Sequence, residues 1–419
     1  MRTIVRQNKQ AQRGRDAMQR RTVLKGGVSL LAAAGAPMVA RAQAPKSIRI
    51  GYAVSLSGPY APGAQSTTWS QYKLWAKDVN DAGGIFLKKH DRKVPIELID
   101  YDDRSQIEEA IRLVERLILN DKVDLVLPPW GTATNLATAP VFNKHEYPAI
   151  HYTASAMRVR QLGPRWPYSF WALVQPDNGT EPLAAMCAQL KKEGKIKGRI
   201  AIMHVADQLG VEMATAMVDA CKKAAVEVVY NKSYPLGVSD LQPQIREVMA
   251  LEPDAFFCFS YPTDTFMVTE QAQVVGFSPP IFYTGVGTPF PAYVAKFGAK
   301  KNGVLLYGAV DTTAPGQKEY IERHKAMFNR GVEIGSIGTY GTLQILQKAI
   351  EQVGEIDRKK IRDAIASGTF ETIADVYTFK DQVHQTAWAV GQWQGDEVVG
   401  IYPADKRGAK PLMFPKPKW

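Results

Sequence analysis

The sequence predicts an α/β protein in which parallel sheets are covered by helices on both faces. Short apolar runs typical of strands alternate with segments whose apolar residues recur at helical spacing, and this alternation is the pattern of βαβ units. It runs twice along the chain, with a crossing between the two cycles near residues 167–176. We therefore expect two doubly wound, Rossmann-like lobes that bind a ligand outside the carboxyl ends of their strands.

Each cycle contains four strand-like runs separated by helix-period segments. The predicted strands are 48–54, 94–100, 123–127 and 148–152 in the first cycle and 199–205, 226–230, 254–260 and 280–285 in the second. A further apolar run at 303–310 precedes a mostly helical stretch, with helices expected over 319–330, 337–353 and 359–365. The last fifty residues return to strands, and Gly395–Asp396 between two alternating runs predicts a hairpin turn.

The charge distribution argues against a nucleic-acid partner. The 419 residues, enough for two or three domains, carry a formal net charge of +11. Residues 1–44 hold nine basic residues and one acidic residue, which leaves 43 basic and 40 acidic residues in the remainder. The remainder is only mildly basic and has no basic stripe suited to a phosphate backbone.

Residues 1–44 are interpreted as an export signal. Arg20 and Arg21 precede a weakly apolar run, and the segment ends in Ala-Gln-Ala, a small-x-small cleavage site after Ala44. The apolar run is shorter than the ~20 residues that cross a bilayer as a helix. The paired arginines are typical of the twin-arginine route, so a periplasmic, soluble mature protein is expected.

Six segments at predicted strand ends are rich in glycine, small hydroxyl residues and aromatic residues: 55–63, 128–135, 151–156, 206–210, 260–264 and 283–289. Hydroxyls and free N–H groups at a helix start hold anions, and glycines let a ligand approach the backbone. Tyr60, Trp130, Tyr152 and Tyr261 could supply apolar walls. Each segment alone is also ordinary turn and cap chemistry. Their recurrence in both halves favours one cleft between two lobes.

Several of these segments resemble a known family. "LSGPYA", "KDVNDAGGI", "IDYDDRS", "PAIHYTASA" and "GQWQGDEVV" are similar to periplasmic substrate-binding proteins of branched-chain amino-acid-type ABC transporters, over nearly all of residues 47–400. The resemblance implies the type I periplasmic binding fold, two lobes joined by a three-strand hinge that close on a ligand. It places lobe one at 45–169 and 308–380 and lobe two at 170–307 and 381–419. A monomer that passes a small molecule to permease subunits, without cofactor or metal, is expected.

The resemblance also implies residue roles in lobe one. The family holds an amino acid's carboxylate with hydroxyls and backbone N–H groups, which fall here on Gly131 or Thr132, on Thr153 and on Ser155.

Two positions in lobe two depart from the family pattern. Thr284 stands where amino-acid-binding members carry the glutamate that holds the α-ammonium, and Leu209 replaces a tyrosine just before Gly210. Asp207 or Asp264 could substitute for the glutamate, but neither lies at the matching position. A buried ammonium without a facing anion is strongly unfavourable. We therefore expect the ligand to be a carboxylate without an α-ammonium, such as an aromatic or other apolar acid. The lobe-two wall of the cleft is expected to offer no counter-charge for an amine.

Two other function classes stay open. The same lobes could form a ligand-sensing receptor or regulator. An enzyme is less well supported, because the chain has no G-x-S-x-G elbow, H-E-x-x-H or P-loop. His151 is expected to be structural or to contact the ligand, and the Asp102–Asp103 pair to form a solvated strand edge. Cys187, Cys221 and Cys258 fit no zinc spacing. Two of them could pair in an oxidising compartment, but we expect all three to be small buried apolar side chains.

Overall fold

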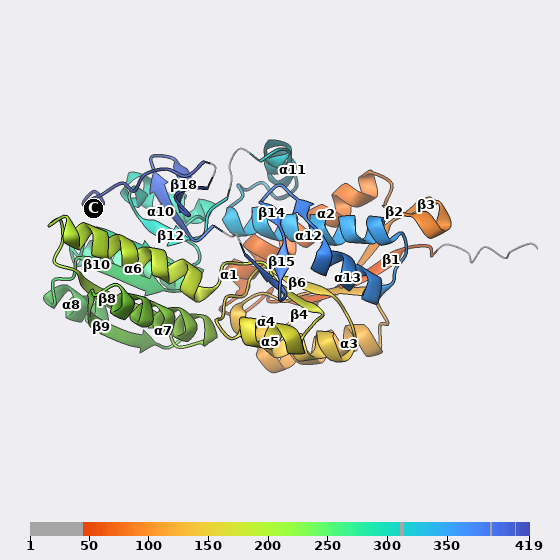
Figure 1. The fold of residues 1–419 in the computed structure, drawn as a ribbon, viewed down its shortest axis with the longest axis horizontal. Helices are drawn as coiled ribbons and strands as arrows, with labels where there is room; N and C mark the ends of the chain where they lie inside the picture. Colours follow the sequence, from red (N-terminus) through yellow and green to blue (C-terminus); the bar gives the residue numbers. More distant parts are fainter. Residues whose placement is uncertain (1–44, 311–313, 386–387, 407) are drawn as a thin grey trace, which may run out of the picture. The chain divides into compact units, whose positions relative to one another are not determined.

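The structure is a computed structural model that describes residues 45–310, 314–385, 388–406 and 408–419. The predicted export signal, 1–44, lies outside the described residues. The described chain is an α/β protein with mostly parallel sheets, as predicted (Figure 1). None of its described helices is long and apolar enough to cross a membrane.

The first lobe contains two sheets. One has the order β4-β1-β5, with both neighbours parallel to β1, and the other has the order β15-β16-β7-β6. Two short ribbons, β2-β3 and β13-β14, accompany them. The strands are β1 Ile48–Val54, β2 Ile85–Leu87, β3 Arg92–Val94, β4 Ile96–Asp102, β5 Leu125–Leu127, β6 Ala149–His151, β7 Ser169–Trp171, β13 Phe370–Glu371, β14 Val376–Tyr377, β15 Phe379–Lys380 and β16 Val383–His384.

Helices cover both faces of the first lobe's sheets. Figure 1 shows α2 and α12 on one face and α3 and α4 on the other. A π-helical turn, Gln65–Trp69, joins the first two helices. The helices are α1 Ala61–Ala64, α2 Ser70–Asp81, α3 Ile107–Leu119, α4 Thr132–Lys144, α5 Val159–Leu162, α11 Gln317–Phe328, α12 Ile334–Val353 and α13 Arg358–Ser367.

The second lobe is built on a seven-stranded sheet of order β18-β17-β12-β11-β10-β8-β9. Its central strands are parallel, and the β17–β18 hairpin turns at Gly395–Asp396 as predicted. The strands are β8 Arg199–Val205, β9 Glu227–Tyr234, β10 Ala255–Phe259, β11 Ile281–Thr284, β12 Leu305–Tyr307, β17 Val390–Gln394 and β18 Glu397–Tyr402; the helices are α6 Pro176–Lys192, α7 Gln208–Lys223, α8 Gln242–Ala250, α9 Pro262–Val274 and α10 Pro291–Phe297.

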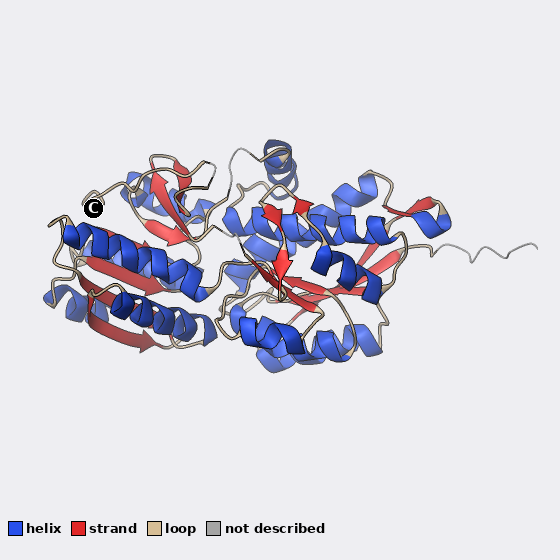
Figure 2. Cartoon of the chain, in the orientation of Figure 1, coloured by secondary structure: helices blue, strands red, loops and turns tan. Residues whose placement is uncertain are grey.

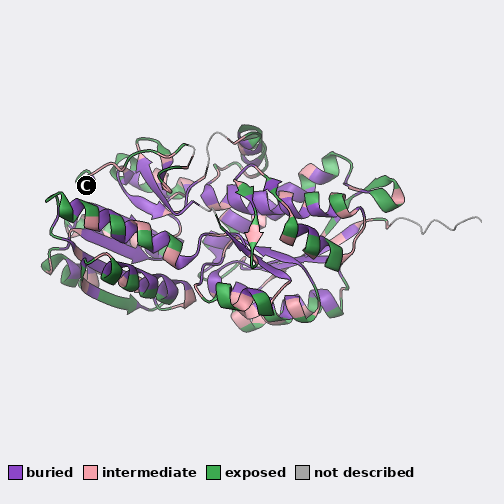
Figure 3. Cartoon of the chain, in the orientation of Figure 1, coloured by how far each residue is buried: buried purple, intermediate pink, exposed green. Residues whose placement is uncertain are grey.

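The burial pattern explains why these segments form strands and amphipathic helices. All five residues of β10 are buried, because helices cover both faces of the sheet (Figures 2 and 3). On α3 the buried residues recur at helical spacing, and Glu108 and Glu109 occupy the first turn, where acidic side chains interact favourably with the helix dipole. The buried residues are Ala110, Leu113, Val114, Leu117 and Ile118. The three cysteines are buried and unpaired, as expected for apolar packing.

The sheets show where the chain passes between the lobes. β7 begins at the predicted limit of lobe one, residue 169, and β16 lies just after its second predicted limit, residue 380; both strands pair within the four-stranded sheet of that lobe. β12 pairs with β11 and β17 in the second lobe. The passages therefore fall between β7 and α6, between β12 and α11, and between β16 and β17. Residues that follow the ends of β6, β7 and β12 line one cavity.

Candidate ligand-binding site

A cavity of about 100 Å³ lies between strand ends of the two lobes. A water molecule needs roughly 10–15 Å³ of such space, so the cavity has room for a small organic molecule. Its wall is largely aromatic and aliphatic, with a few threonines, two acids and one histidine. The lining residues are Thr67, Trp130, Thr132, Tyr152, Thr153, Ala172, Leu173, Val174, Leu209, Tyr261, Gly285, Val286, Gly287, Pro289, Phe290, Tyr307, Gly308, Ala309, Val310, Glu333, Ile334, Gly335, Ala374, Asp375, Tyr377, His384 and Trp388.

Six of the residues chosen from the sequence line this cavity. They come from both lobes and all follow a strand end or begin a helix, which explains their convergence. The six are Trp130, Thr132, Tyr152, Thr153, Leu209 and Tyr261.

The other five chosen residues lie beside the cavity without lining it. Thr284 is buried and its hydroxyl bonds to that of Thr288 (2.7 Å). Ser155 donates to the Val174 carbonyl (2.8 Å) and bonds to the Tyr307 hydroxyl (2.6 Å). Tyr60, Gly131 and Asp207 form an outer layer described below. The next three residues, Gly285, Val286 and Gly287, line the cavity in place of Thr284.

The start of α4 is the part of the wall best suited to an anion. Gly131, its N-cap, has φ of 93°, a conformation that favours glycine. The Thr132 hydroxyl accepts from the Ser155 N–H (3.1 Å), and its own hydrogen has no acceptor among the described residues. The Thr153 hydroxyl, by contrast, accepts from Gly131 N (3.3 Å) and donates to the Pro129 carbonyl (3.3 Å). Thr132 and the first N–H groups of α4 are therefore the free donors.

Two aromatic rings, Trp130 and Tyr261, line one side of the cavity, and a third, Tyr60, packs behind them. Tyr60, Trp130 and Tyr261 have ring centroids 5.2–5.5 Å apart, and Trp130 Nε1 donates to Thr67 Oγ1 (2.8 Å). The Tyr60 hydroxyl donates to Asp207 across the lobes (3.2 Å), and Asp207 also accepts from Gly210 N as the N-cap of α7. Tyr60 and Asp207 thus support the aromatic wall from behind.

Two acids on the wall were not anticipated from the sequence. Glu333 caps α12 and accepts from Gly335 N (2.5 Å) and Ser336 N (2.8 Å); burial raises its pKa, against the effect of these bonds. Asp375 bonds to Lys406 (2.5 Å). Burial raises the pKa of Asp375, but His384 and Lys406 beside it lower the pKa further, to below its usual value. Both acids lie in segments predicted for lobe one, not at the lobe-two position of Thr284, and both already accept bonds from within the protein.

The hydroxyls of residues 55–63 serve the turn itself. Ser55 donates to Asp103 (2.6 Å) and Ser57 to Asp102 (2.7 Å). Asp103 is fully buried, which corrects the expectation of a solvated acid pair. These bonds fix the turn that presents the Tyr60 ring.

His151 has a structural role, one of the two roles expected from the sequence. It is buried, its Nδ1 lies 2.6 Å from Asn135 Oδ1, and its ring stacks on Trp171. Burial lowers its pKa to about 3, so it stays neutral near pH 7. No group of three or more metal-ligating side chains occurs in the described part of the chain.

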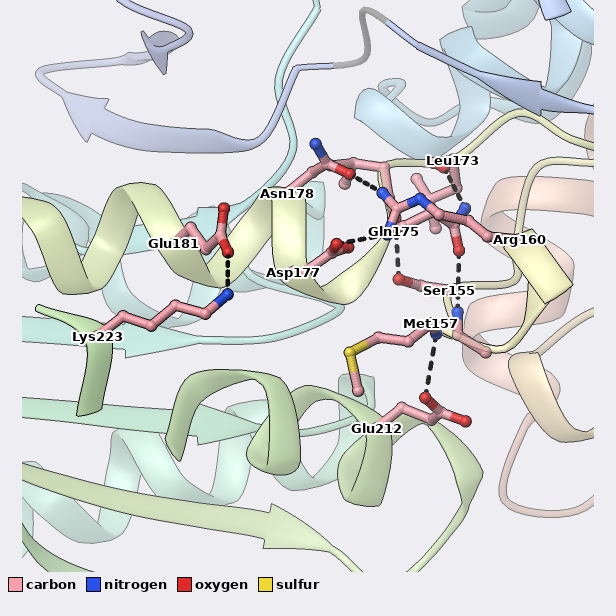
Figure 4. A network of polar contacts seen from close by, with 12 residues as sticks. Ser155, Met157, Arg160, Leu173, Gln175, Asp177, Asn178, Glu181, Glu212 and Lys223 are labelled. Atoms are coloured by element: carbon pink, nitrogen blue, oxygen red, sulfur yellow. Dashed lines mark hydrogen bonds and ion pairs between the residues drawn. The ribbon is translucent and has the colours of Figure 1, made fainter. Parts of the chain in front are cut away.

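Polar contacts join the lobes beside the cavity (Figure 4). Glu212 of α7 accepts from Met157 N (3.0 Å) and Arg158 Nε (2.9 Å), and Figure 4 shows Met157 and Glu212 facing each other. Arg160 bonds to Asp177 and Asn178 of α6. The connection that follows β6 is thereby tied to two helices of the second lobe.

Comparison with known proteins relates the chain to one family. A family model described as periplasmic binding protein matches residues 47–397. The leucine-, isoleucine-, valine-, threonine- and alanine-binding protein of Pseudomonas aeruginosa is 22% identical over 356 residues, which cover 84% of this chain and 91% of that protein.

Two solved structures share the fold. The branched-chain amino acid transporter substrate-binding protein of Streptococcus pneumoniae, in complex with isoleucine, superposes with a TM-score of 0.72 at 20% identity, covering 84% of this chain and 98% of that one. A solute-binding protein of an ABC transporter from R. palustris, in complex with benzoate, gives a TM-score of 0.73 at 17% identity, covering 89% and 97%. Both likenesses agree with the two-lobed fold predicted from the sequence.

Proposed function

The chain belongs to the periplasmic binding protein family, and we propose that it captures a small carboxylate between its lobes and delivers it to the permease of an ABC transporter. The observation that carries the proposal is the unused Thr132 hydroxyl hydrogen at the start of α4, within an otherwise mostly apolar cavity. A carboxylate there would accept from Thr132 and from the helix N–H groups. Ligand shifts the lobes toward closure only by its higher affinity for the closed form.

The proposed ligand lacks an α-ammonium. Thr284 bonds away from the cavity, and the two carboxylates on the wall, Glu333 and Asp375, already accept bonds from within the protein. An ammonium would have to compete with those donors or remain without an anion of its own, which is costly in a buried site. The aromatic wall suits an apolar acid. The benzoate named for the R. palustris neighbour supports this class, whereas the isoleucine named for the S. pneumoniae neighbour represents the alternative.

A thermal-shift screen tests the ligand class. Stabilisation by a bound ligand grows as RT ln(1 + [L]/Kd), so benzoate and aliphatic acids should raise the melting temperature in a concentration-dependent way. Neutral benzamide, the matched control without the charge, should not. Strong stabilisation by leucine or valine, with none by the acids, would refute the proposal.

Thr132 provides the residue-level test. Thr132→Val keeps the shape but removes the hydroxyl, and we expect binding of the acid to weaken by about tenfold to a hundredfold, since a hydrogen bond to a charged group contributes about 1.5–3 kcal/mol. Thr132→Ser should retain most of the affinity. Thr138→Val is the matched control. Thr138 lies further along the same helix and its hydroxyl donates to the Thr134 carbonyl, so this variant should bind the acid with the affinity of the wild type. Equal affinities for Thr132→Val and the wild type would remove Thr132 from the site.

A further inference from the structure

The cavity wall contains a buried histidine whose outer ring nitrogen is unused. His384 lies in β16 and lines the cavity, and its side chain is 1% exposed. Its Nε2 has no hydrogen-bond partner among the residues that the structure describes. Buried polar atoms of this kind call for an explanation, since most are paired.

The other ring nitrogen fixes what Nε2 can do. His384 Nδ1 lies 3.2 Å from the Thr378 carbonyl oxygen. A carbonyl oxygen only accepts, so Nδ1 carries the hydrogen, and Nε2 of the neutral ring is an acceptor. Asp375 Oδ2, also an acceptor, lies 3.7 Å from Nε2, beyond hydrogen-bond distance, and would pair with His384 only if the ring were protonated. No donor among the described residues bonds to Nε2.

A second unused group on the same wall has the opposite character. Trp388 lines the cavity, is buried, and its Nε1–H has no acceptor among the described residues. An indole N–H can only donate. The cavity therefore presents one acceptor, on His384, and one donor, on Trp388, that the protein leaves unsatisfied.

The remaining groups around His384 argue against a charged partner. Asp375 is neutralised by Lys406, which also lies 5.1 Å from the Trp388 ring centroid. The Tyr377 ring packs against the His384 ring, with 4.5 Å between the two ring centroids. With its one nearby carboxylate paired, this end of the cavity attracts neither an ammonium nor a second carboxylate strongly. An ammonium could not accept from Trp388, and a carboxylate could not donate to His384.

We propose that this end of the cavity recognises a hydroxyl group of the ligand, which donates to His384 Nε2 and accepts from Trp388 Nε1. A hydroxyl is the uncharged group that both donates and accepts from a single small atom. The inference rests on the proposed function, in which the same ligand's carboxylate binds at Thr132. The ligand class is then a small hydroxylated acid, with its carboxylate and hydroxyl held at separate parts of one apolar cavity.

Matched pairs of acids test this inference. Isothermal titration compares benzoate with its 2-, 3- and 4-hydroxy derivatives, and 4-methylpentanoate with 2-hydroxy-4-methylpentanoate. At least one hydroxylated acid should bind about tenfold more tightly than its parent, the usual size of a satisfied neutral hydrogen bond. The methyl ether of that acid accepts but cannot donate, and should lose the advantage.

Two variants link the advantage to the two groups. His384→Leu removes the acceptor, and Trp388→Phe removes the donor while keeping an aromatic ring. Each should reduce the ratio of the affinities for the hydroxylated acid and its parent severalfold, and the ratio is compared within each variant so that any effect common to both acids cancels. If His384→Leu does not fold, the change in preference measured for Trp388→Phe alone still tests the inference.

The outcomes separate the two proposals. Parent acids that bind as tightly as the hydroxylated ones, or a preference that both variants retain, would overturn this inference and leave the proposed function standing, with water occupying the gap. Failure of every acid to bind, together with binding of leucine, would overturn the proposed function and this inference with it.

Discussion

Gly338→Ala is expected to weaken ligand binding by about tenfold or more while the protein remains folded. A Cβ built on Gly338 would lie 1.8 Å from Cζ and 2.0 Å from the hydroxyl oxygen of Tyr152. Tyr152 must therefore leave the surface of α12, and the space next to it is the cavity that it lines. Overpacking of this kind typically costs about 1–3 kcal/mol. Alanine's better helix propensity, by about 1 kcal/mol, offsets part of the cost to folding.

A double variant distinguishes this steric route from a general disturbance of α12. Tyr152→Leu shortens the side chain, so adding Gly338→Ala to it should have little further effect on affinity. The two substitutions should thus be strongly non-additive, as contacting residues are. Titration of all four proteins with one bound acid measures the coupling. Additive effects, or unchanged binding by Gly338→Ala alone, would show that Tyr152 is not a wall of the ligand site.

Local patterns predicted the secondary structure well, because strand and helix signals lie within a few neighbouring residues. The run "IRIGYAV" became β1, Ile48–Val54, with its bounds unchanged. The helix expected over 337–353 became α12, Ile334–Val353, extended at its start by the Glu333 cap. The strand-end rule for parallel sheets likewise brought Trp130, Thr132, Thr153 and Tyr261 to one cavity.

What could not be predicted depends on side-chain direction and on distant segments. The hydroxyls of Ser55 and Ser57 were expected to bind an anionic ligand. They instead donate hydrogen bonds to the carboxylates of Asp103 and Asp102, at the end of the neighbouring strand β4. Glu333, Asp375 and His384 join the wall from the far end of the chain, where the sequence shows only a helix cap and short strands. Nothing local to those residues indicates which way they face.

Asp264, considered from the sequence as a partner for an amine, has a different physical role. It lies in the first turn of α9 and is 1% exposed, and it does not line the cavity. Burial raises its pKa from 3.8 to about 6; the Tyr261 backbone N–H opposes this shift, and the charge of Asp207 adds to it. Ionisation of this side chain near pH 7 therefore destabilises the folded protein relative to the unfolded chain.

Asp264→Asn is expected to stabilise the protein at pH 7.5 by about 1–3 kcal/mol, since each pKa unit corresponds to about 1.4 kcal/mol. The native state holds the proton more tightly than the unfolded chain between the ordinary pKa of 3.8 and about 6, so the wild type loses stability as pH rises through that window. Asparagine does not titrate. The stability gap between variant and wild type should be small near pH 4, widen up to about pH 6 and then stay constant, as measured by urea unfolding at each pH.

The matched control has the opposite sign. Asp357 caps α13, accepts from Lys360 N (3.0 Å) and is held ionised, because that backbone bond and the Lys360 charge lower its pKa. Asp357→Asn should therefore be less stable than the wild type at pH 7.5, with a difference that shrinks as pH falls and the carboxyl is protonated. The two variants should diverge from the wild type in opposite directions as pH rises. An Asp264→Asn gap that does not vary with pH would mean that folding leaves the pKa of Asp264 unshifted. A gap that follows the sign of Asp357→Asn would mean that the fold favours the ionised Asp264. Either result would show that burial is not the dominant influence there.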